Sequence, residues 1–165
     1  MGRRSDSTGG TTAAVADREV LTAVARGLVT AAAPEELPLF SAMTTAYFDR
    51  GGVEPGRARE DMLGFGADAA VMLVTPAAFE VARRVFDYLA GQVKASVEAE
   101  TADAISAHVH RLFHHGGDSH EPARLTYVQL EEVHRIAVEQ ARAMNLSEQQ
   151  ADILGDSLVG SLAIE

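Results

Sequence analysis

The chain has 165 residues, of which 47% are hydrophobic and 23% are charged, and it contains no cysteine. These values are typical of a single globular domain, and they exclude a wholly disordered chain, disulfide bonds and sites built on thiolates. The formal net charge of −10 argues against a nucleic-acid-binding protein, because phosphate groups are bound by clustered cations.

Residues 1–14 are small and polar and show no periodicity, so we predict a flexible N-terminal tail. This stretch lacks the apolar core of a secretory signal, and we therefore expect a cytoplasmic protein. Arginine is used almost to the exclusion of lysine, with Lys94 as the single exception, and alanine is abundant. That usage is typical of GC-rich bacterial coding.

Residues 15–115 are predicted to form a helical core. Apolar residues recur at helical spacing after Asp17, which is a suitable cap for the first helix. A second helix follows Pro34 and ends at Gly51–Gly52. Thr75 is placed to cap the next element, since a proline follows it directly.

A long central helix is predicted because no proline interrupts the chain from Ala77 to His115. As one rod it would extend about 58 Å, far beyond the width of so small a domain. Either another polypeptide covers it, or it breaks at Gly91 or within residues 98–104. Its apolar stripe has coiled-coil spacing, and we interpret it as the buried seam of a homo-oligomer or larger assembly. The stripe consists of Phe79, Ala82, Phe86, Leu89 and Val93.

Residues 116–125 are predicted to be a loop, and residues 126–165 a C-terminal helical hairpin. Thr126 is placed to cap its first helix, and Ser147 with Gln150 forms a capping box for its second. No segment alternates with a period of two, so the chain is predicted to be all-α with five to six helices. Residues 116–165 hold nine acidic residues against three arginines, which favours a basic protein partner.

A histidine-rich stretch from His108 to His120 is the main candidate for metal binding. His110 and His114 are four residues apart, so they share one face of a helix, which is ligand geometry for a divalent metal. Asp118 or His120 would supply a third ligand. The alternative interpretation is a solvated helix end, where the helix dipole favours imidazolium.

Gly155–Leu158 spells the G-D-S-L pattern in which a serine serves as the nucleophile of some esterases. That chemistry needs the serine on a strand-to-helix turn with a histidine downstream, whereas Ser157 is predicted to lie inside a helix and no histidine follows it. We therefore predict no catalytic residues and no cofactor.

Residues 62–89 are the most apolar part of the chain and allow two readings. They form either a buried core or interface segment, or an amphipathic element that meets a membrane through Arg83 and Arg84. The interspersed acidic residues favour the first reading. Together these patterns predict a non-enzymatic protein-interaction or assembly subunit. A small membrane-active effector and a metal-binding protein remain as alternatives.

Overall fold

The computed structural model describes residues 8–52, 74–96, 102–113 and 124–163. Within these ranges the chain forms six α-helices, one 3₁₀-helix and no strand, which confirms the predicted all-α class. The elements are α1 (Thr8–Ala32), η1 (Pro34–Leu39), α2 (Phe40–Asp49), α4 (Val74–Ser96), α5 (Ala102–Phe113), α6 (Tyr127–Ala143) and α7 (Glu148–Leu162).

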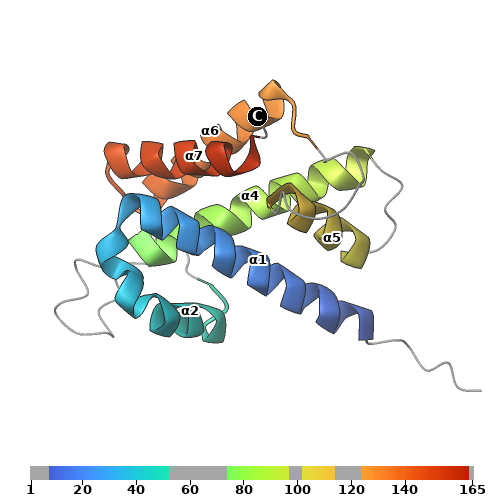
Figure 1. Ribbon diagram of the computed structural model, residues 1–165, viewed down its shortest axis with the longest axis horizontal. Coiled ribbons are helices and arrows are strands. Elements are labelled where there is room, and N and C mark those ends of the chain that lie inside the picture. The colour runs from blue at the N-terminus through green and yellow to red at the C-terminus, as the bar shows by residue number, and fades with distance from the viewer. Residues whose placement is uncertain (1–7, 53–73, 97–101, 114–123, 164–165) are drawn as a thin grey trace, which may run out of the picture.

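Helix α4 runs through the middle of the molecule and the other helices are arranged around it (Figure 1). Helix α1 packs along α4, α5 packs against both of them, and α6 covers a further side of α4. Helices α6 and α7 lie side by side as an antiparallel hairpin, as the sequence predicts, and α2 lies near the start of α4 (Figure 1).

The first part of α4 is buried on every side. Each residue from Val74 to Ala82 is buried, and nearly all of them are small or apolar. A helix that is apolar all round requires cover on every face, which explains its central position. Phe79 is fully buried and lies in an aromatic cluster with three rings that belong to α2. These rings belong to Phe40, Tyr47 and Phe48.

Of the two alternatives for the segment from Ala77 to His115, a covered rod and a broken helix, the structure supports the second, because the described residues form two helices there. Helix α4 ends at Ser96, and α5 begins at Ala102 and packs back against α4 and α1. Folding back allows α5 to bury Val109 and Leu112 in the core that α1 and α4 already form. Gly91 lies inside α4, so it is not a break point, and residues 97–101 between the two helices lie outside the described residues.

Helix α1 begins at Thr8, so residues 8–14 are helical rather than part of the predicted tail. Residues 1–7 lie outside the described residues. Asp17, expected as the cap of this helix, lies within it and accepts a hydrogen bond from the Ser106 hydroxyl of α5. A side chain that the sequence suggested for a helix end therefore joins two helices.

The start of α4 is held by a carboxylate from a distant part of the chain. Glu36 of η1 is buried and accepts hydrogen bonds from the backbone amides of Val74 at 3.2 Å and Thr75 at 2.8 Å. The hydroxyl of Thr75, the predicted cap, also donates to Glu36, at 2.5 Å. A negative charge at a helix N-terminus is favourable, and here it fastens η1 to the central helix.

Two arginines of α1 reach across to aromatic rings that line α2. The Arg18 guanidinium lies 4.4 Å from the ring centre of Phe48, and that of Arg26 lies 6.0 Å from the ring centre of Phe40. The later arginine, Arg26, contacts the earlier ring, Phe40, and the earlier arginine, Arg18, contacts the later ring, Phe48. Helices α1 and α2 therefore run in opposite directions. Exposed arginines thus cover the outer side of the aromatic cluster.

A buried polar pair ties α2 to α4. The Tyr47 hydroxyl donates a 2.8 Å hydrogen bond to Glu80. Burial, together with the nearby Glu80 charge, holds the pKa of Tyr47 well above its usual range. Gly52 has a positive φ of 106°, which a residue with a side chain rarely adopts, and a Cβ there would lie only 3.0 Å from a carboxylate oxygen of Glu80. Gly51 and Gly52 end α2, as the sequence predicts.

Candidate interaction surface

The α6–α7 hairpin is held rigidly by its own sequence. Thr126 and Ser147 each form a complete capping box, the first with Gln129 and the second with Gln150, at the starts of α6 and α7. The facing sides of the helices are buried and small or apolar, with Val133, Ala137 and Ala141 on α6 and Ala151, Leu154 and Leu158 on α7. The capped starts and the buried facing sides stabilise the two helices against each other.

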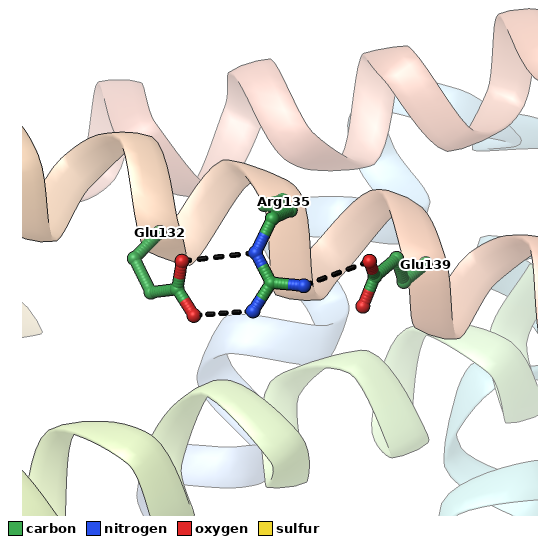
Figure 2. Close-up of polar contacts among 3 residues, drawn as sticks. All are labelled: Glu132, Arg135 and Glu139. Atoms are coloured by element: carbon green, nitrogen blue, oxygen red, sulfur yellow. Dashed lines mark hydrogen bonds and ion pairs between the residues drawn. The ribbon is translucent and has the colours of Figure 1, made fainter.

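Arg135 lies between two glutamates on the solvent face of α6 (Figure 2). Its Nε donates to Glu132 at 2.9 Å, its Nη2 also contacts Glu132, and its Nη1 donates to Glu139 at 2.7 Å. The hydrogen bond from Arg135 lowers the pKa of Glu132, which favours the ionised form of that carboxylate. One guanidinium thus serves two carboxylates, and a negative charge remains.

Two further contacts join the hairpin helices. Arg142, at the end of α6, donates to Glu148 of α7 at 3.1 and 2.5 Å. His134 Nε2 lies 3.2 Å from an Asp156 carboxylate oxygen. Both contacts are on the exposed surface, so they position the side chains more than they stabilise the fold.

Acidic residues outnumber basic ones on the hairpin. Residues 124–163 contain six acidic side chains and three arginines, a balance of −3. Because Arg135 and Arg142 are bound by glutamates of the hairpin itself, neither is free to offset the remaining acids. Glu131 is exposed and forms no hydrogen bond or ion pair with any other described residue.

Two large apolar side chains are exposed at the start of α6. Tyr127 is 74% exposed and Val128 is 71% exposed. Helix α4 borders this part of α6, because Gln129 donates to Gln92 at 3.5 Å. Burial raises the pKa of Tyr88 on α4, and the nearby charge of Glu132 raises it further. Gln129 of α6 lies near Gln92 of α4, and the later residue Glu132 lies near the earlier residue Tyr88, so the two helices are antiparallel. We call Tyr127, Val128 and Glu131 the α6 patch.

The α6 patch was not predicted from the sequence, although Val128 carries a signal. Leu130, Val133 and Ala137 mark the side of α6 that faces the protein. Val128 falls off that stripe, so one bulky apolar residue is expected to point toward solvent. Tyr127 precedes Leu130 by three residues and continues the stripe, so its exposure follows only from the structure. An apolar residue off the stripe of an amphipathic helix is the informative one.

The central stripe, predicted as an intermolecular seam, lies inside the chain. All five of its residues are buried by the other helices of the same molecule. They are Phe79, Ala82, Phe86, Leu89 and Val93. The inference that a second polypeptide must cover them is therefore wrong, because it assumed a continuous rod.

The candidate metal ligands are mostly beyond what the structure describes. His114, Asp118 and His120 lie outside the described residues, and His110 is half-buried in the last turn of α5. Among the residues with described positions, no group of three potential ligands could hold a metal ion.

Ser157 lies within α7, as predicted, and lines a cavity of about 190 Å³ between α1, α5 and α7. Its neighbours there are small or apolar, including Gly27, Phe113 and Ser161. No histidine or carboxylate lines this cavity, so the described residues place no catalytic partner beside Ser157. Gly155 is buried against His134 and Val138 rather than on a polar face.

The apolar segment 62–89 is described only from Val74 onward, and the apolar residues of that part are buried in the core. None of the helices in the described ranges is long and apolar enough to cross a bilayer. Arg83 and Arg84 are exposed, but Arg83 lies near the Glu80 carboxylate and both arginines lie near Asp87. The described part of the segment therefore offers no free basic face.

Comparison with family models, with curated proteins and with solved structures gives no match for this chain. The fold and its surface are thus the basis for a functional proposal.

Proposed function

We propose that this protein is a non-enzymatic helical interaction module whose α6–α7 hairpin docks a basic partner protein. The observation that carries the proposal is the excess of carboxylates on a rigid hairpin that already pairs two of its three arginines. Uncompensated charge at fixed positions steers an oppositely charged partner and selects against acidic ones.

Two further features support this role. The exposed side chains of Tyr127 and Val128 provide apolar contact area beside the acids, and tyrosine is common where proteins meet. The N-terminal helices form a core that supports the hairpin through contacts of α6 with α4 and of α7 with α1. The central stripe does not contribute to this surface, because its residues are buried within the chain.

The test is a binding assay with three labelled peptides of equal length that are arginine- and lysine-rich, neutral, or glutamate-rich. We expect the basic peptide alone to bind, with an affinity that falls as salt is raised, because the attraction is screened. Equal binding of the neutral peptide, or no binding of the basic one, contradicts the proposal.

A matched pair of charge reversals locates the site. The double variant Glu131→Lys and Asp152→Lys changes the hairpin, and Glu19→Lys with Glu35→Lys makes the same change in charge on α1 and η1. All four residues are exposed. Only the hairpin variant should lose the basic peptide. Equal losses in both would indicate attraction to the overall charge and would remove the hairpin from the proposal.

A further inference from the structure

The α6 patch combines an aromatic ring, an aliphatic side chain and a carboxylate on neighbouring positions of one helix. Glu131 is four residues from Tyr127 and three from Val128, and both spacings place side chains next to each other on a helix surface. All three side chains are exposed, and Glu131 has no partner among the described residues. The patch therefore offers a charge without a counter-ion beside uncovered apolar area.

We propose that the α6 patch binds an arginine of the basic partner, with an aliphatic residue of the same partner segment against Val128. This inference rests on the proposed function and names the chemistry that the docking hairpin selects. A guanidinium is planar, so it can lie over the ring of Tyr127 while its N–H groups donate to the Glu131 carboxylate. A lysine ammonium makes the ion pair but lacks the flat face.

The same two contacts occur inside this protein. Arg18 lies over the ring of Phe48, and Arg135 is bound by Glu132 and Glu139 on the same helix as the patch. Because Glu132 and Glu139 already bind Arg135, an incoming cation meets less competition at Glu131 than at either of them. Elsewhere in the chain, an aromatic ring and carboxylates of this kind are each in contact with an arginine of the protein itself. The α6 patch places a ring and a carboxylate side by side without such an arginine among the described residues.

The experiment compares two basic peptides of equal charge, one containing arginines beside leucines and the other with every arginine replaced by lysine. Tyr127→Ser should weaken the arginine peptide by about threefold, the size of an exposed cation–π contact, and should change the lysine peptide less. Glu131→Gln should weaken both peptides by about twofold. Tyr127→Phe, which keeps the ring, should bind as the unchanged protein does.

Leu39→Ser and Glu35→Gln are the matched controls, because they alter an exposed apolar residue and an exposed carboxylate on η1. Both should bind each peptide with unchanged affinity. The chain has no tryptophan and three tyrosines, so a peptide without aromatic residues can be followed by tyrosine emission. The change in emission on binding should disappear in Tyr127→Ser.

The outcomes separate this inference from the broader proposal. If both peptides bind equally and only the hairpin charge reversal matters, the docking role stands and the arginine site is overturned. If neither peptide binds, both proposals fall. A dimer of the protein alone that Tyr127→Ser converts to a monomer would overturn the arginine site too, because a second copy would then occupy the patch.

Discussion

The Glu36 carboxylate accepts hydrogen bonds from both the backbone amide and the hydroxyl of Thr75, at 2.8 and 2.5 Å, although the two residues are 39 positions apart in the sequence. The carboxylate is buried, and it satisfies donors at the start of α4 that would otherwise have no partner in the helix. This contact fixes where the central helix begins relative to η1.

Replacing this carboxylate should destabilise the fold. Glu36→Gln removes the charge at the start of α4 and one hydrogen-bond acceptor, and we expect the free energy of unfolding to fall by about 1–3 kcal/mol. Chemical denaturation followed by far-UV circular dichroism measures the change. Glu35→Gln, an exposed neighbour, should stay within about 0.5 kcal/mol. Equal stability of the two variants would show that the cap contributes little.

Two glycines of α7 should respond in opposite directions to alanine. A Cβ at Gly155 would lie 2.8 Å from His134 Cδ2 and 3.1 Å from a Val138 methyl, so Gly155→Ala should destabilise by about 1–3 kcal/mol. Gly160 has open space around the same position, and alanine there should stabilise by up to about 1 kcal/mol. The melting temperatures of both variants measure these changes. A higher melting temperature of Gly155→Ala would contradict the close packing of the hairpin at this position.

A buried amide is expected to cost stability. Nε2 of Gln140 is buried and has no hydrogen-bond partner among the described residues. Gln140→Met keeps the unbranched shape without the unpaired donor, so it should raise the free energy of unfolding by about 1 kcal/mol. Gln149→Met, on the exposed side of α7, is the control and should be nearly neutral. A clear loss of stability in Gln140→Met would mean that the amide is satisfied.

Stability should fall in mildly acidic solution because of His108. Burial, and secondarily the Arg111 charge, hold the pKa of His108 below its ordinary value of 6.5. The unfolded chain therefore takes up a proton before the folded chain does, and the free energy of unfolding decreases as the pH falls through about 6.5 toward the folded pKa.

His108→Gln should flatten this part of the pH profile, as measured by denaturation at a series of pH values. Arg111→Gln should flatten it partly, because it removes the second cause and leaves the burial. An unchanged slope in His108→Gln would assign the pH dependence to other groups.

The parts of the fold that the sequence predicted correctly depend on contacts within a few residues. The capping box of Ser147 with Gln150, and the helix end at Gly51–Gly52, are set by local hydrogen bonds and backbone freedom. Only part of the proposed interaction surface could be predicted from the sequence. The acidic character of the hairpin could be read from the sequence, whereas the pairing of Arg135 and the exposure of Tyr127 and Val128 could not be measured there.

The amino-acid sequence by itself determined that the chain is all-α, where its last two helices begin, and that its C-terminal part is acidic, because periodicity, caps and charge are properties of short segments. Only the tertiary structure decided that the apolar stripe of α4 faces its own chain. Burial depends on which distant segments pack together, and α5 gains more by folding back onto α1 and α4 than by extending a rod into water. The same packing buries the stripe of α4 and leaves Tyr127 and Val128 exposed on the outer side of α6, where the proposed binding surface lies.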